Sequence, residues 1–353
     1  MKLKKILKIA YVSVFFGFLL VMGIASFVIK DKGNGKEKPV ELEYSGYTDW
    51  SKGFDTYFSA NFALRKNFIQ LDSQIKYNVF KYTSERGVIT GSEGWLFYED
   101  ALHDYTGENI LSDEDITKIA DSIEAMSAKV REQGAKLVFT VAPNKMEIYG
   151  EYMPYFLTES KEAGNYEKLM AELEKRDVLY VDMKKVLSED DTFGNTNLYY
   201  KWDSHWNALG ASVAYKAIME AADMAYTDYS DIEYTYKNNF KADLYSMFFP
   251  LGTEKDKNYY FSKEESYEYI SNYKSDDDLL IETANENGTG EVIFFRDSFG
   301  NALYSFFAND FAKADISRAL PYDVSDVGDA NLVVIEIVER NIPKLIDAYK
   351  GDA

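Results

Sequence analysis

The feature that most constrains this chain is an apolar run close to its N-terminus. Residues 9–29 (IAYVSVFFGFLLVMGIASFVI) contain no charged side chain. At a rise of about 1.5 Å per residue, a helix of this length crosses a hydrocarbon core of about 30 Å. Four lysines precede the run, and the positive-inside rule keeps such residues in the cytoplasm. We therefore predict a cytoplasmic basic segment over residues 1–8 and a transmembrane helix over residues 9–29.

A cleaved signal peptide is the alternative interpretation of this run. The apolar core of a typical signal peptide has roughly 7–15 residues, and the run is longer than that. The small-x-small cleavage sites near its end are also poor. We therefore favour an uncleaved single-pass anchor in the cell membrane, with the bulk of the chain extracytoplasmic. Residues 30–50 begin with a Gly- and Lys-rich stretch and are predicted as a linker to a domain over residues 51–353.

Composition excludes several classes of function. The chain has no cysteine, which rules out disulfides, thiolate metal sites and a cysteine nucleophile. It has only two histidines, so a multi-histidine metal site is unexpected and we predict neither a metal nor a cofactor. The formal net charge is −20, whereas nucleic-acid binding needs clustered cations. We therefore expect no nucleic acid among the partners.

Helical and strand patterns alternate along most of the domain. Ser112 begins a capping box followed by apolar residues at helical spacing, and further helices are predicted over about 162–176, after Asn207 and from about Gly300. Short apolar, β-branched runs predict buried strands at 136–142, 178–183, 291–295 and 331–338. This alternation predicts an α/β fold with a parallel sheet flanked by helices. Residues 226–279 are rich in tyrosine and charge and are predicted to be an irregular excursion.

Residues that directly follow strands are the first candidates for chemistry, because ligands bind at the carboxyl ends of parallel strands. Three segments contain such residues, namely Pro143 to Lys145, Asp203 with His205, and Ser298. A serine hydroxyl becomes a nucleophile when a histidine removes its proton, and a carboxylate holds that histidine in the required tautomer. Backbone N–H groups at the start of the helix after Ser298 would face an oxyanion. These residues therefore favour a Ser-His-Asp site.

Each of these residues also has a structural interpretation. Asp297 with Ser298, and Asp203 with Ser204, are common helix caps. His205 stands between two tryptophans and could be a packing residue, and His103 is interpreted as a loop histidine. The residues alone leave these alternatives open.

Four segments carry a resemblance to a known family. They are Gly94-Trp95-Leu96-Phe97-Tyr98, Ala142-Pro143-Asn144-Lys145, Asp203-Ser204-His205-Trp206-Asn207 and Arg296-Asp297-Ser298-Phe299. In this order, over roughly residues 50–340, the chain resembles the SGNH-hydrolase-like proteins of exopolysaccharide acetylation, which include the AlgJ/AlgX group and the DHHW family. Arg296 stands where that family usually has the glycine of a G-D-S motif.

The resemblance implies an SGNH-hydrolase-like fold in which Ser298 is the nucleophile, His205 the base and Asp203 the acid. It also suggests residues for substrate binding or the oxyanion, namely Asn144, Lys145, Arg318 and Tyr322. The implied activity is O-acetylation of an exopolysaccharide or cell-wall glycan through an acetyl-serine intermediate. A membrane-bound O-acyltransferase would supply the acetyl groups. Two alternatives remain: an extracytoplasmic carbohydrate acetyl esterase with the same triad, and a non-catalytic glycan-binding or assembly protein.

Overall fold

The computed structural model describes residues 2–28, 53–54, 57, 64–81 and 84–349. The predicted linker over residues 30–50, together with Ile29, lies outside the described residues. The chain forms two units. The first comprises residues 1–75 with 249–252, and the second comprises residues 76–248 with 253–353.

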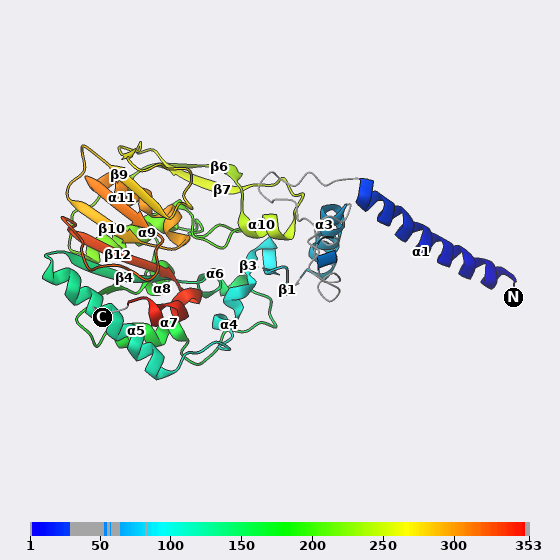
Figure 1. Cartoon of the computed structure of the whole chain (residues 1–353), viewed down its shortest axis with the longest axis horizontal. Coiled ribbons are helices and arrows are strands. Elements are labelled where there is room, and N and C mark those ends of the chain that lie inside the picture. Colours follow the sequence, from blue (N-terminus) through cyan, green and yellow to red (C-terminus); the bar gives the residue numbers. More distant parts are fainter. Residues whose placement is uncertain (1, 29–52, 55–56, 58–63, 82–83, 350–353) are drawn as a thin grey trace. The chain divides into compact units, whose positions relative to one another are not determined.

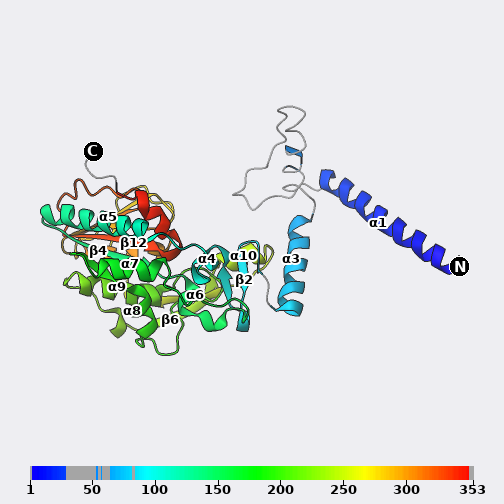
Figure 2. The ribbon, with the colours of Figure 1, turned by 90° about the horizontal axis from the view of Figure 1, so that it is seen from below.

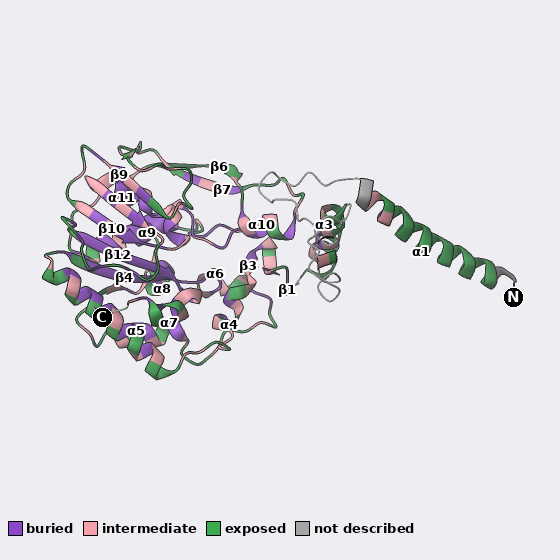
Figure 3. Cartoon of the chain, viewed as in Figure 1, coloured by how far each residue is buried: buried purple, intermediate pink, exposed green. Residues whose placement is uncertain are grey.

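The first unit contains the apolar run. Helix α1 spans Lys2–Val28, and its segment Lys4–Ala25 has a mean hydropathy of 2.1 with little of it buried. Figure 3 shows α1 exposed along most of the part that it colours. By length and composition, this helix is able to cross a membrane. Helix α3 spans Arg65–Ile75.

The second unit is built on a seven-stranded sheet of order β5-β4-β12-β10-β11-β9-β8 (Figure 1). Five neighbouring strands, β5, β4, β12, β10 and β11, are parallel. At one edge, β9 pairs with β11 in antiparallel fashion, and β8 pairs with β9 in the same way. The predicted α/β fold is therefore confirmed. The strands are β4 (Lys136–Ala142), β5 (Leu179–Val181), β8 (Glu268–Tyr269), β9 (Leu280–Ala284), β10 (Glu291–Phe295), β11 (Lys313–Ser317) and β12 (Leu332–Val338).

Helices cover both faces of this sheet (Figure 2). Because side chains alternate along a strand, Val333 and Ile335 of β12 pack into the cluster that contains residues of α5 and α7. Leu332 and Val334 pack into the opposite cluster, with residues of α8, α9 and α11. The helices are α5 (Asp113–Glu132), α7 (Asn165–Leu173), α8 (Met183–Glu189), α9 (Ala208–Ala221) and α11 (Tyr304–Asp310).

Capping side chains explain where several elements begin and end. The Asn207 side chain accepts hydrogen bonds from the first turn of α9, as its position predicted. The strand predicted over 178–183 ends earlier, because Asp182 caps α8 through the N–H of Lys185. The helix predicted from about Gly300 starts as a 3₁₀ turn, η6 (Phe299–Ala302), which precedes α11.

The predicted irregular excursion over residues 226–279 contains regular structure, so this expectation was wrong. Strands β6 (Tyr234–Phe240) and β7 (Asp256–Phe261) pair in antiparallel fashion, α10 spans Asp243–Phe248, and β8 joins the main sheet. Six of the seven residues of β6 are exposed. A strand without a buried face has no alternating apolar pattern, and therefore gave no period-two signal in the sequence.

A small antiparallel sheet adjoins the carboxyl end of β4. It consists of β1 (Ser84–Glu85), β2 (Val88–Thr90) and β3 (Leu96–Tyr98). Trp95, just before β3, stacks on Tyr149 and Tyr152 with ring centroids 4.7 Å apart in both pairs. The remaining short helices are η1 (Lys76–Phe80), η2 (Ser92–Gly94), η3 (Glu99–Ala101), α4 (Leu102–Tyr105), α6 (Lys145–Ile148), η4 (Gly150–Tyr152), η5 (Tyr229–Asp231) and η7 (Glu339–Asp347).

Sheet topology brings three separate segments to one edge. Strands β4, β12 and β10 are parallel neighbours, with Ala142 opposite Val338 and Phe295 opposite Ile335. The residues that follow them therefore emerge side by side, although they are far apart in the sequence.

Candidate active site

Ser298 lies on the turn between β10 and η6, and the preceding residue fixes that turn. The Asp297 carboxylate accepts hydrogen bonds from the N–H of Phe299 (3.0 Å), the N–H of Val338 (2.8 Å) and the side-chain amide of Asn341 (3.1 Å). These bonds join the turn to the end of β12. Asp297 is therefore a structural anchor of the serine turn.

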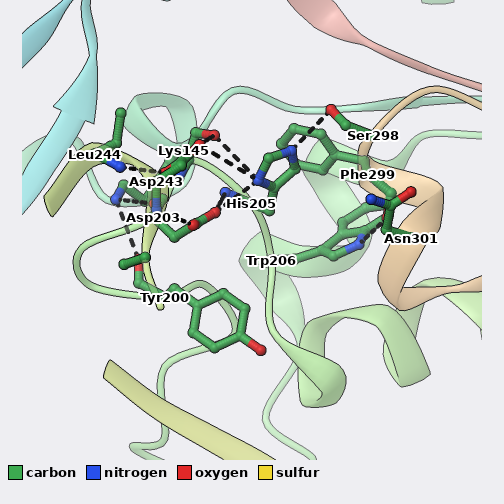
Figure 4. A network of polar contacts seen from close by, with 12 residues as sticks. Lys145, Tyr200, Asp203, His205, Trp206, Asp243, Leu244, Ser298, Phe299 and Asn301 are labelled. Atoms are coloured by element: carbon green, nitrogen blue, oxygen red, sulfur yellow. Dashed lines mark hydrogen bonds and ion pairs between the residues drawn. The ribbon is translucent and has the colours of Figure 1, made fainter. Parts of the chain in front are cut away.

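The structure brings Ser298, His205 and Asp203 together (Figure 4). His205 Nε2 lies 2.9 Å from Ser298 Oγ, and His205 Nδ1 lies 2.7 Å from Asp203 Oδ1. The carboxylate holds the proton on Nδ1, which leaves Nε2 free to accept the serine proton. The other histidine, His103, is exposed and pairs with Glu108.

Asp203 is buried and its carboxylate is fully engaged. Besides the imidazole, Oδ1 accepts from the N–H of His205 (3.1 Å) and Oδ2 accepts from the N–H of Asp243 (2.6 Å). The Asp243 carboxylate accepts from the Ser204 hydroxyl at 2.7 Å and lies 3.9 Å from His205 Nδ1. Ligand atoms of Asp203, His205 and Asp243 lie close enough to hold a metal ion. Their hydrogen bonds already form an Asp-His pair supported by a second carboxylate.

Burial and charge act on these groups in opposite directions. Burial lowers the pKa of the His205 imidazole, but the hydrogen bond and charge of Asp203, with the charge of Asp243, raise it above 6.5 overall. Burial raises the pKa of the Asp203 carboxyl, but the bonds from His205 and Asp243 hold it below its ordinary value. Burial and the charge of Asp203 raise the pKa of Asp243 to about 6.

Lys145, which the resemblance suggested for substrate binding or the oxyanion, has a supporting position in the structure. It is buried, and burial lowers its pKa to about 8. Its ammonium lies over the rings of Trp95 and Phe97, at 5.6 and 5.2 Å from their centroids. It donates to three backbone carbonyls, those of Tyr200 (3.2 Å), Lys201 (3.2 Å) and Asp203 (2.6 Å). Lys145 therefore holds the segment that carries Asp203.

The other three residues expected in substrate binding or at the oxyanion have three different sets of partners. Asn144 is buried, and its side-chain oxygen accepts from Arg340 at 3.3 Å. Arg318 instead donates to Asp277 at 3.0 Å, and Tyr322 is buried against Phe295. Within residues 84–349, neither Arg318 nor Tyr322 makes a hydrogen bond to the triad.

Two residues at the site, Arg340 and Asp243, were missed by sequence reasoning. The Arg340 guanidinium lies over the rings of Phe299 (5.6 Å) and Tyr98 (5.2 Å). Its signal was its position two residues after a buried strand, at the edge where ligands bind. Asp243 gave no signal, because its contacts with Asp203 and Ser204 come from residues distant in the sequence.

Arg296 fits at the serine turn because a glycine leaves room for it. A side chain at Gly300 would approach Arg296 to within 2.5 Å. The guanidinium donates to the carbonyls of Asp297 (3.2 Å) and Asp276 (2.7 Å) and to the Asn301 side chain. The residue that replaces the usual glycine of the motif therefore cross-links the turn.

Comparison with curated proteins identifies relatives. The chain is 24% identical to the "Probable alginate O-acetylase AlgJ" of Pseudomonas syringae pv. tomato over 208 residues, which cover 59% of this chain and 50% of the relative. It is 22% identical to the protein of the same name from Pseudomonas fluorescens over 169 residues, covering 48% and 41% of the two chains. The chain thus spans about half the length of these relatives.

Two solved structures share the fold. A DHHW family protein from Eubacterium siraeum has a TM-score of 0.55 at 16% identity, covering 75% of this chain and 96% of that one. Bacillus cereus PatB1 has a TM-score of 0.54 at 16% identity, covering 72% and 96%.

A protein family matches the central part of the chain. The match covers residues 88–288, which include Asp203 and His205 and end before Ser298. The family is described as the SGNH hydrolase-like domain of the acetyltransferase AlgX, and the chain belongs to it.

Proposed function

We propose that this chain is a membrane-anchored O-acetyltransferase that modifies an extracytoplasmic polysaccharide through an acetyl-Ser298 intermediate. The observation that carries the proposal is the 2.9 Å contact between Ser298 Oγ and His205 Nε2, with Asp203 2.7 Å from Nδ1. Membership of the AlgX family and relatives named alginate O-acetylases support the same activity.

The first half reaction forms the acetyl-serine. His205 Nε2 takes the proton from Ser298 Oγ as that oxygen attacks the carbonyl carbon of an acetyl ester. Asp203 stabilises the resulting imidazolium, which then returns the proton to the leaving oxygen of the donor. Arg340, held against the Phe299 ring, supplies positive charge near the developing oxyanion.

The second half reaction transfers the acetyl group. His205 removes the proton of a sugar hydroxyl, whose oxygen attacks the acetyl-serine, and Ser298 recovers the proton as it leaves. An esterase would follow the same course with water in place of the sugar. A transferase therefore needs a site that retains the glycan and excludes water.

The proposal also states how the chain is held at the membrane and which kind of protein supplies its acetyl groups. An uncleaved α1 would anchor the chain in the membrane. The domain predicted over residues 51–353, which we call the body, would then lie outside the membrane and close to a membrane-bound O-acyltransferase that supplies acetyl groups. A non-catalytic glycan-binding protein would not require the aligned hydrogen bonds on both nitrogens of His205.

Substitution of the triad tests the activity. We expect Ser298→Ala and His205→Ala each to lower acetyl transfer from a small activated ester to an oligosaccharide by about four to six powers of ten. The double variant should be little worse, because the two residues act as a unit. The matched control is His103→Ala, which removes the other histidine and should leave transfer unchanged. Unchanged turnover in purified Ser298→Ala would contradict the proposal, and acetate release indifferent to added sugar would identify an esterase.

The pH profile tests the role of His205. The imidazole accepts a proton only when it is neutral, so turnover should fall as the pH drops through its pKa. Since that pKa is raised, half-maximal turnover is expected above pH 6.5. Asp243→Asn removes one charge that raises this pKa, and should therefore move the acid limb to lower pH. Initial rates on a small ester would measure the shift, with the exposed Asp177→Asn as control. An acid limb that Asp243→Asn leaves in place, or moves to higher pH, would refute this role.

Protease accessibility tests the topology. Added to intact, wall-stripped cells, protease should digest the body, while a cytoplasmic marker protein stays intact. The undigested chain should be found in the membrane fraction and retain Met1. Protection of the body in intact cells would exclude the proposed orientation.

A further inference from the structure

A pocket lies beside the segment that carries Asp203 and His205. Its volume is about 390 Å³, within the range of small-molecule sites. One wall comes from residues of the segment 197–207, and the other from the strand pair β6–β7 and the residue before β7. We call it the lysine-rimmed pocket, after the three lysines among its lining residues, Lys201, Lys255 and Lys257.

The rim of this pocket is positively charged in a chain whose net charge is −20. Lys201, Lys255 and Lys257 form no ion pair among residues 84–349, and Lys257 lies over the Tyr236 ring at 4.7 Å. The one acidic lining residue, Asp256, is buried, and it accepts from the N–H groups of Trp202 (2.7 Å) and Lys257 (2.8 Å). The lining therefore contains three lysines and one carboxylate, and that carboxylate already accepts two hydrogen bonds.

The rest of the lining has groups that suit a sugar. The half-buried Trp202 offers an aromatic surface, and its indole N–H is held by the carbonyl of Gly94 at 3.0 Å. Asn197 and Asn238 are exposed, so their amides are available to hydroxyl groups. Aromatic surface, amides and cations together favour a polar, negatively charged sugar over an apolar ligand.

The pocket is close to the catalytic residues but distinct from them. Asn207 lines it and is two residues from His205, which limits the distance between their Cα atoms to about 7 Å. In the view of Figure 4 the Tyr200 ring lies below His205 and Ser298 lies above it. A polymer that reaches Ser298 can therefore place another of its sugars in this pocket.

We propose that the lysine-rimmed pocket binds a carboxylated or phosphorylated sugar residue of the acceptor glycan, apart from the sugar that receives the acetyl group. This inference rests on the proposed function. The negative body repels a polyanion at long range, but salt screens exposed charges beyond about 8–10 Å. The rim lysines therefore decide the local attraction.

A direct measurement of oligosaccharide binding tests the proposed role of the pocket independently of catalysis. Calorimetry on the full-length Ser298→Ala protein in detergent would compare tetragalacturonate with the neutral cellotetraose. We expect tighter binding of the acidic tetramer, weakened by added salt. The double variant Lys255→Glu with Lys257→Glu should raise the dissociation constant of the acidic tetramer by about tenfold or more. Lys255→Gln with Lys257→Gln, which removes the charges without reversing them, should raise it by less. Lys241→Glu, an exposed lysine outside the pocket, is the matched control for each charge reversal.

The outcomes separate this inference from the proposed function. The pocket assignment is wrong if the protein binds the acidic and neutral tetramers with equal affinity. It is also wrong if Lys241→Glu lowers the affinity for the acidic tetramer as much as Lys255→Glu does. Either result holds even if Ser298 transfers acetyl groups. Lysine-dependent binding would support the assignment even if transfer failed. Competition by glucuronate against glucose 6-phosphate then distinguishes a carboxylate from a phosphate as the bound group.

Discussion

The buried carboxylate of Asp203 is the constraint on which the second unit depends. An ionised carboxylate away from water is unstable unless hydrogen bonds replace its hydration. Here His205 and the N–H of Asp243 provide those bonds, while Lys145 holds the Asp203 carbonyl. Lys145 in turn lies over Trp95 and Phe97. Three segments that are distant in the sequence therefore form one physical unit behind the imidazole.

The serine turn depends on a second set of contacts. Asp297 ties it to the end of β12, and Arg296 ties it to the carbonyl of Asp276 at the end of the excursion. Gly300 makes space for that arginine. The excursion thus contributes at two places, with Asp243 beside His205 and the Asp276 carbonyl bonded to Arg296 at the serine turn. This explains how a long insertion of polar composition is part of the site.

The sequence predicted those features of the fold that local residue patterns determine. The runs over 136–142 and 291–295 became β4 and β10 with those bounds, because strands buried on both faces are continuously apolar. Asp203, His205 and Ser298, which the structure brings within hydrogen-bonding distance, were singled out because they follow strands or precede a helix and match the motifs of the family. Strand β6 was missed because it is largely exposed. Lys145 was a candidate for substrate binding or the oxyanion, and nothing local in the sequence reveals that its hydrogen-bond acceptors are carbonyls some 55 residues later.

The most direct test of the account is the location of the acetyl group during turnover. With excess acetyl ester and no acceptor, peptide mapping by mass spectrometry should find one acetyl group on Ser298. That group should disappear when an accepting oligosaccharide is added, and should be absent from His205→Ala. Ser204, whose hydroxyl also lies near the imidazole, serves as the internal comparison. Acetyl transfer to sugar without acetylated Ser298, or with the group on Ser204, would contradict the account.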